Sequence, residues 1–197
     1  MKQNIYDDSG FFDEYGKMPR SKEGLHAAGE WHVLKTMFPD FEHKNVLDLG
    51  CGYGWHCIYA MQQGASHVIG VDLSAKMIRK AKENSAGLDI DYRQMAIEDV
   101  NFATEEFDIV ISSLALHYIK DLENVFQKVN HFLKRGGALS FLWNIRYSQQ
   151  ERSRIGIRMN KVHACTGLWI ITSRKAEEMQ CSWDMTSSSI TEPWRLC

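Results

Sequence analysis

Val46-Leu47-Asp48-Leu49-Gly50-Cys51-Gly52-Tyr53-Gly54-Trp55-His56 is the stretch that decides the fold of this chain. It predicts a buried strand that ends in a glycine-rich turn and leads into a helix. A second strand is expected at residues 67–72, and it ends at the carboxylate of Asp72. Glycines let the backbone approach a ligand where a Cβ would clash, and an acid at the end of the next strand can accept both ribose hydroxyl protons. The two strands together therefore predict a site for a nucleoside.

The spacing of the glycines separates two kinds of nucleoside site. The dinucleotide fingerprint Gly-x-Gly-x-x-Gly needs its third glycine where the helix packs against the strand, with a pyrophosphate at the helix N-terminus. In this chain Trp55 occupies that position, and Asp48 adds an acid two residues before the first glycine. These two residues disfavour an NAD-dependent oxidoreductase. A glycine turn after a first strand is also compatible with a parallel α/β protein of another function.

Apolar spacing extends the pattern on both sides of this segment. A helix is expected from Lys22 to Met37, capped by Ser21, because its apolar residues recur near one face. The pattern further predicts helices at 55–63, from the cap Ser74 to about residue 84, and at 122–133, and strands at 90–95, 107–113 and 138–142. This alternation is typical of an α/β fold, a doubly wound, mostly parallel sheet with helices on both faces.

Four polar or small residues fall at or just beyond the predicted carboxyl ends of the strands: Asp48, Asp72, Ala96 and Ser113. Ligands of such sheets bind outside the carboxyl ends of the strands. We therefore expect these four residues to share one pocket.

Several segments resemble the small-molecule branch of the class I, Rossmann-like S-adenosylmethionine-dependent methyltransferases, with a type 11-like methyltransferase domain. The resemblance covers roughly residues 40–142, and it is specific for the cofactor rather than for the substrate. The segments that carry it are Asp48 to Gly54, Val71 to Met77, Phe107 to Val110, Leu114 to Tyr118 and Leu133 to Gly137.

The resemblance implies S-adenosyl-L-methionine as the cofactor and roles for particular residues. It implies that Gly50 and Gly52 approach the methionine part, that Asp72 binds the ribose hydroxyls, and that Leu73 and Met77 flank the adenine. Many relatives carry an acid near the end of the third strand, where this chain has Ala96, so adenine recognition is expected to use the backbone N–H of Ile97. The role of Glu98 stays open. The predicted cofactor-binding residues are Asp48, Gly50, Cys51, Gly52, Asp72, Leu73, Met77, Ala96, Ile97 and Ser113.

Methyl transfer needs mainly a nucleophile held in line with the sulfonium, at about 3 to 3.5 Å. If the acceptor is a hydroxyl or a protonated amine, His117 is the candidate base, because histidine titrates near neutrality. The alternative is that His117 bonds to backbone or cofactor. Arg20 is either a partner of the cofactor carboxylate or a surface residue. The predicted wall of the acceptor pocket consists of aromatic residues and a histidine that could equally be core: Tyr6, Tyr15, Trp55, His56 and Tyr118.

Composition limits the remaining possibilities. At 197 residues and 44% hydrophobic, the chain suits a single domain. A net charge of -2 without a basic run predicts no nucleic-acid or membrane partner. The resemblance implies a small-molecule acceptor. No apolar stretch approaches the ~20 residues that cross a bilayer, and no signal peptide is visible, so the cytoplasm is expected. The five cysteines form no Cys-x-x-Cys pair, so no metal site is predicted. The sequence does not identify the methyl acceptor or the oligomeric state.

The pattern predicts three regions: an N-terminal helical cap segment at 1–39, a cofactor-binding core at 40–142, and an irregular tail at 143–197. In the tail the alternation of strands and helices stops, and four of the six tryptophans lie there without a period. The two final strands that the resemblance implies are therefore expected to be missing or irregular.

One hypothesis for the tail is that the coding frame slips near Leu142. One extra base upstream lets residues 142–148 be encoded as Val-Glu-His-Pro-Ile-Phe-Thr, which resembles the continuation of related methyltransferases. The DNA sequence across codons 138–145 tests this hypothesis. The alternative function is accordingly a catalytically inactive or truncated cofactor-binding protein, while the first expectation is a methyltransferase that acts on a small molecule.

Overall fold

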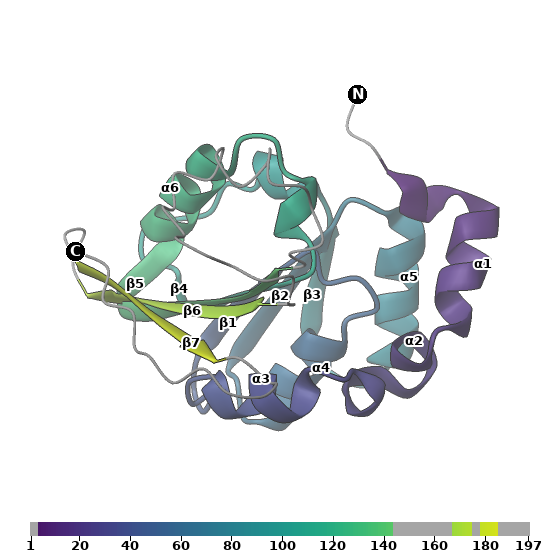
Figure 1. Cartoon of the computed structure of the whole chain (residues 1–197), viewed down its shortest axis with the longest axis horizontal. Coiled ribbons are helices and arrows are strands. Elements are labelled where there is room, and N and C mark those ends of the chain that lie inside the picture. Colours follow the sequence, from purple (N-terminus) through teal and green to yellow (C-terminus); the bar gives the residue numbers. More distant parts are fainter. Residues whose placement is uncertain (1–3, 144–166, 175–177, 185–197) are drawn as a thin grey trace.

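The computed structural model describes residues 4–143, 167–174 and 178–184. In these ranges seven strands form one sheet in the order β3-β2-β1-β4-β5-β6-β7 (Figure 1). The first five strands of the chain are parallel to one another. The strands are β1 (Asn45–Leu49), β2 (His67–Asp72), β3 (Ile90–Gln94), β4 (Phe107–Ser113), β5 (Leu133–Trp143), β6 (Gly167–Arg174) and β7 (Glu178–Asp184). The α/β fold with a mostly parallel sheet is thereby confirmed.

Some helices connect these strands, and the others precede β1 in the chain. None of the helices in the described ranges is long and apolar enough to cross a membrane. The α-helices are α1 (Ser9–Lys17), α2 (Pro19–Glu23), α3 (Trp31–Met37), α4 (Trp55–Gln62), α5 (Ala75–Asn84) and α6 (Leu122–Phe132). The short 3-10 helices are η1 (Ile5–Asp7), η2 (Gly24–Ala27), η3 (Ile97–Asp99) and η4 (Leu116–Tyr118).

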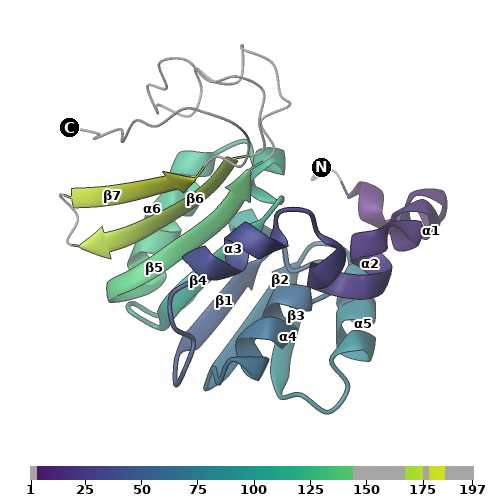
Figure 2. The ribbon, with the colours of Figure 1, turned by 60° about the horizontal axis from the view of Figure 1, so that its bottom comes forward.

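Alternate side chains of β1 pack against opposite layers, as a strand buried on both faces requires. Leu47 and Leu49 lie in one apolar cluster with Val125 and Val129 of α6. Val46 lies in a second cluster, whose other members include residues of α4 and α5. Helices therefore cover both faces of the sheet, with α6 on one side and α3 and α4 on the other (Figures 1 and 2).

The predicted helix from Lys22 to Met37 is wrong as a single element. The structure has α2, η2 and α3 in its place, separated around Gly24, whose φ is +72°. A left-handed residue cannot continue a right-handed helix, so the chain breaks there although the apolar spacing continues. The cap on α5 is confirmed, because the Ser74 hydroxyl accepts a hydrogen bond from Met77 N at 3.1 Å.

The tail differs from the expectation that its strands are missing. β6 pairs antiparallel with β5, and β7 pairs antiparallel with β6. An antiparallel pair needs no crossover helix, so the alternation of strands and helices could not reveal it. Most of the tail lies outside the described residues, including most of the segment proposed for the frame slip, so the DNA test of that hypothesis still stands.

Candidate functional site

A cavity of about 860 Å³ opens at the carboxyl ends of the parallel strands, beneath the N-terminal helices. This volume is within the range of small-molecule and cofactor sites. The turn after β1 contributes Gly50, Cys51 and Gly52, and the ends of β2 and β4 contribute Asp72 and Ser113. The strand ends that the sequence singled out thus meet in one cavity, with the exception of Asp48.

The glycine turn is fixed to β2 and leaves space on its open side. Gly50 N and Cys51 N both donate to the carbonyl of Val71, at 2.8 and 2.9 Å. Gly52 has a φ of +53°, and a Cβ built on it would meet nothing within 4 Å. Because Gly52 also lines the cavity, a ligand can lie directly against its backbone.

Asp72 presents its carboxylate to the same cavity. Its Oδ2 accepts from Gly52 N at 2.9 Å, and its Oδ1 accepts from Ser74 N at 2.8 Å. Burial raises the pKa of Asp72, and the two backbone hydrogen bonds oppose this rise. Each oxygen still has a lone pair for a second donor. The carboxylate is therefore oriented by the backbone and can accept two ligand hydroxyls.

The next part of the wall combines apolar side chains with a helix start. Leu73, Met77, Ala96 and Ile97 all line the cavity. Ile97 is the first residue of η3, so its N–H has no acceptor within that helix. This arrangement suits a flat, largely apolar group with an acceptor at its edge.

The segment after β4 forms the wall near the N-terminal residues. Leu114 has a φ of +55°, an uncommon conformation for a leucine, and it lines the cavity with His117 and Tyr118. Burial lowers the pKa of His117. The hydroxyls of Tyr6 and Tyr118 lie 3.0 Å apart, and burial followed by this hydrogen bond raises the pKa of Tyr6. This wall therefore offers a neutral histidine among tyrosine rings.

A group of nitrogen atoms lies where α4 begins. Trp55 Nε1 and His56 Nε2 are buried from water, line the cavity and have no hydrogen-bond partner among the described residues. Burial, and then the positive charge of Arg20, lowers the pKa of His56 to about 3. Arg20 itself donates to Glu30 at 2.8 Å. The first turn of α4 has no side-chain cap. These groups can serve a ligand that accepts hydrogen bonds.

Asp48 is the one predicted cofactor residue that does not line the cavity. It is 1% exposed, and its Oδ2 accepts a hydrogen bond from Cys57 Sγ at 3.4 Å. Burial raises its pKa to about 7. Asp48 lies inside β1, two residues before Gly50, and its side chain is buried rather than part of the cavity wall.

All five residues predicted for the acceptor pocket, and His117, line the cavity. The sequence reasoning missed several others, which belong mainly to the N-terminal helices and to the segment after β4. Their place in the sequence could have indicated three of them, because Leu114 and Ala115 directly follow a predicted strand end and Tyr53 stands inside the glycine turn. The missed lining residues are Asn4, Ile5, Met18, Ser21, Gly24, Leu25, Ala28, Tyr53, Glu98, Leu114, Ala115, Ile119 and Lys120.

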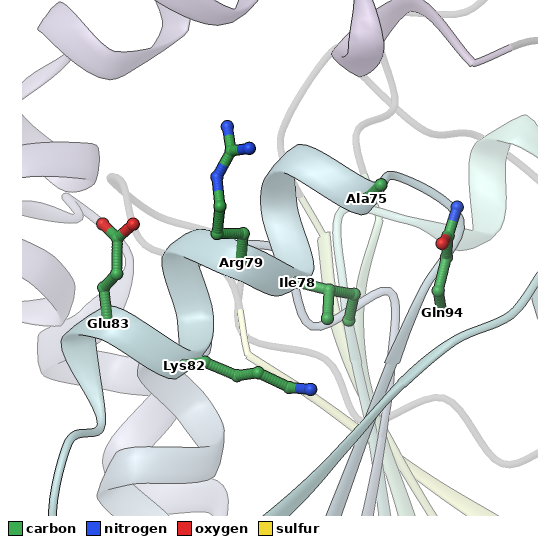
Figure 3. A pocket seen from close by; sticks show the side chains of 6 residues that line it. All are labelled: Ala75, Ile78, Arg79, Lys82, Glu83 and Gln94. Atoms are coloured by element: carbon green, nitrogen blue, oxygen red, sulfur yellow. The ribbon is translucent and has the colours of Figure 1, made fainter.

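A second, shallower depression of about 450 Å³ lies along α5, away from the glycine turn. Figure 3 shows its side chains, most of them on the outside of α5, with Gln94 coming from the end of β3. None of the predicted site residues lines it. Its walls are Ala75, Ile78, Arg79, Lys82, Glu83 and Gln94.

Comparisons with known proteins agree with this location of the site. Residues 47–141 match the family described as "Methyltransferase domain". A solved structure from Listeria monocytogenes, described as an S-adenosylmethionine-dependent methyltransferase, is 37% identical with a TM-score of 0.58; the likeness covers 81% of this chain and 78% of that one. A structure of the same description from Mesorhizobium loti is 38% identical with a TM-score of 0.59, over 61% of this chain and 56% of that one.

Among curated proteins, the ubiquinone biosynthesis O-methyltransferase of Brucella anthropi is 36% identical over 101 residues, which are 50% of this chain and 40% of that protein. The chain spans 58% or less of the length of the first curated relatives that it matches.

Proposed function

This chain belongs to the methyltransferase-domain family of S-adenosylmethionine-dependent enzymes, and from that premise we propose that it methylates a small-molecule acceptor. When bound, S-adenosylmethionine supplies a methyl group on a sulfonium, which is a strong methyl donor. The observation that carries the proposal is the pairing of Asp72 with Gly52: a carboxylate with free lone pairs lies beside a glycine whose open side faces the same cavity.

The residues present fit the cofactor at three points. Asp72 is proposed to accept the two ribose hydroxyls, since both of its oxygens are already oriented by backbone donors. Gly52 leaves the room that a side chain would fill. The N–H of Ile97, which has no acceptor within η3, suits a ring nitrogen of adenine, and Met77 lines the same cavity.

The start of α4 is proposed to bind the carboxylate of the methionine part. An uncapped helix N-terminus favours an anion. Trp55 Nε1 adds an unpartnered donor, and Arg20 lines the same cavity. One Arg20 nitrogen is taken by Glu30, which leaves other guanidinium donors for a ligand.

The acceptor is proposed to lie between the segment after β4 and the N-terminal tyrosines. Tyr6, Tyr15 and Tyr118 line this part of the cavity, and their rings meet nearly at right angles around Tyr6. His117 is neutral at physiological pH because burial lowers its pKa, so it can take a proton from an acceptor hydroxyl. Holding the acceptor in line is the main catalytic task of such a site.

Titration calorimetry with S-adenosylhomocysteine tests the cofactor assignment. The wild type is expected to bind it and to give no heat with NAD. Asp72→Asn is expected to weaken binding by about 30-fold, because a charged acceptor of two hydrogen bonds is lost. Asp89→Asn, which changes an exposed carboxylate outside the cavity, is the matched control. Equal affinity of the Asp72 and Asp89 variants would overturn the role of Asp72.

Turnover with a panel of small phenols, thiols and amines tests the acceptor class. Hydroxyl compounds come first, because the Brucella relative is an O-methyltransferase. Formation of S-adenosylhomocysteine with one of them supports the proposal. Turnover that requires a protein or RNA acceptor would contradict it, and tight binding without any turnover would favour the catalytically inactive alternative.

A further inference from the structure

We infer that Asp7 is a positioning residue of the cofactor site, which fastens residues 4–18 as a roof over the cavity and thereby slows the release of the cofactor. This inference rests on the proposed function. The roof consists of η1, α1 and the residues that flank them. It lies beside α5 in both views (Figures 1 and 2).

The first fastening joins the roof to the residue that orients the ribose carboxylate. Asp7 Oδ1 accepts from Ser74 Oγ at 2.5 Å and from Lys76 N at 3.2 Å. The N–H of the same Ser74 donates to Asp72 Oδ1 at 2.8 Å. Ser74 thus bridges two carboxylates, that of Asp7 in the roof and that of Asp72 in the cavity wall. A displacement of Asp7 is therefore expected to change the position of Ser74 and the orientation of Asp72.

The second fastening joins the roof to a different part of the cavity wall. Tyr6, which directly precedes Asp7, places its hydroxyl 3.0 Å from that of Tyr118 in the segment after β4. The roof therefore spans from the start of α5 to the wall formed after β4. Its inner side closes the cavity with Asn4, Ile5, Tyr6, Tyr15 and Met18.

The rest of the roof contributes little to keep it closed. No residue of η1 or α1 is buried. The further contacts of α1 with α5 are polar or ring contacts at the surface: Lys76 Nζ donates to Ser9 Oγ at 3.0 Å and lies 5.6 Å from the ring centroid of Phe12. Segments with few buried apolar contacts open at low free-energy cost. Phe12 and Tyr15 add ring contacts with Tyr53 of the glycine turn, at 5.8 and 5.6 Å between centroids. We expect the two hydrogen-bonded fastenings to contribute most to keeping the roof closed.

Asp7 is suited to this task by its charge. Burial opposes ionisation, but hydrogen bonds from Ser74, Lys76 and Asn4 lower the pKa of Asp7 below its ordinary value. The ionised carboxylate lies at the N-terminus of α5, where a negative charge is favoured, and charge-assisted hydrogen bonds are stronger than neutral ones.

The test compares Asp7→Ala and Asp7→Asn with the control Asp8→Asn. Asp8 caps α1 through Phe11 N, and asparagine preserves that cap. We expect Asp7→Ala to raise the dissociation rate of radiolabelled S-adenosylhomocysteine about tenfold, since a charged hydrogen-bonding group is lost. The dissociation rate of Asp7→Asn should lie between those of the wild type and Asp7→Ala, and the rate of the Asp8→Asn control should equal that of the wild type. The Tm of the ligand-free protein should change by less than about 3 °C, because the roof buries no residue.

A purely structural role for Asp7 predicts a different pattern, namely a fall in Tm with an unchanged dissociation rate, and that pattern would overturn the inference. Tyr118→Phe removes the second fastening alone and is expected to raise the dissociation rate by a smaller factor. If the wild type fails to bind S-adenosylhomocysteine, the proposed function fails. If the wild type binds and Asp7→Ala releases the compound at the same rate, only the positioning role is refuted.

Discussion

Gly50 and Ala115 approach so closely that a Cβ on Gly50 would lie 2.3 Å from the Cβ of Ala115. Gly50 also has a φ of +79°. Gly50→Ala therefore combines backbone strain with a clash between the turn after β1 and the segment after β4. We expect it to lower the free energy of unfolding by about 3 kcal/mol, measured by urea unfolding.

Gly87→Ala is the matched control for this variant, because Gly87 has a φ of +89° and an added Cβ there meets nothing within 4 Å. Its free energy of unfolding should fall by about 1 kcal/mol, from the backbone strain alone. Equal losses in the two variants would refute a close packing of the two segments.

Gly52→Ala is expected to separate binding from folding. The added Cβ meets no protein atom within 4 Å and enters the space proposed for the cofactor. The unfolding free energy should fall by about 1 kcal/mol from the positive φ, while the affinity for S-adenosylhomocysteine, measured by calorimetry, should fall about tenfold or more for lack of room. Unchanged affinity would place the cofactor elsewhere.

His56 is expected to make the protein less stable in mild acid. Its pKa is about 3 in the folded state, because burial and then Arg20 disfavour its charge, against 6.5 for free histidine. Between these values the unfolded state binds the extra proton, so stability falls as the pH drops from about 6.5, by up to about 1.4 kcal/mol per pH unit. His56→Phe should lose this dependence in urea unfolding at pH 5 and 7. A parallel pH profile for variant and wild type would contradict the burial of a neutral imidazole.

Asp48 is expected to act in the opposite direction. Its pKa rises from 3.8 to about 7, chiefly through burial, so the folded state holds a proton that the unfolded state has lost. Stability therefore falls as the pH rises from about 4 to 7, at up to about 1.4 kcal/mol per unit. Asp48→Asn mimics the protonated form, and its stability relative to the wild type should grow over this window. A constant difference from pH 4 to 8 would refute the assignment.

The opposing slopes of these two groups should partly cancel in the wild type between about pH 4 and 6.5. The double variant His56→Phe with Asp48→Asn is then expected to resemble the wild type in its pH profile more closely than either single variant does.

Local signals in the sequence were sufficient to predict the glycine turn and the position of Asp72 at a strand end. Glycine by itself tolerates positive φ values, and aspartate by itself supplies a carboxylate. The strand at 107–113 was predicted with the bounds that the structure has, since a continuous apolar run can only be buried on both faces. Helix breaks at Gly24 were harder to predict, because the apolar spacing continues across them.

Local sequence signals could not predict contacts between distant parts of the chain. Nothing in residues 4–18 indicates that Asp7 meets Ser74, 67 positions later, since an acid before a helix normally caps that helix. Asp48 was predicted to touch the cofactor, yet its backbone lies inside the sheet and its side chain is buried beneath the turn. The roles of the individual site residues stay predictions until the variants described above are measured.

The indole of Trp55, whose Nε1 is shielded from water in the cavity wall, gives the protein a built-in optical probe. Its fluorescence should change whenever the space beside it fills or empties, so ligand exchange could be followed in real time without a label. Trp55→Phe would identify its share of the emission among the six tryptophans of the chain.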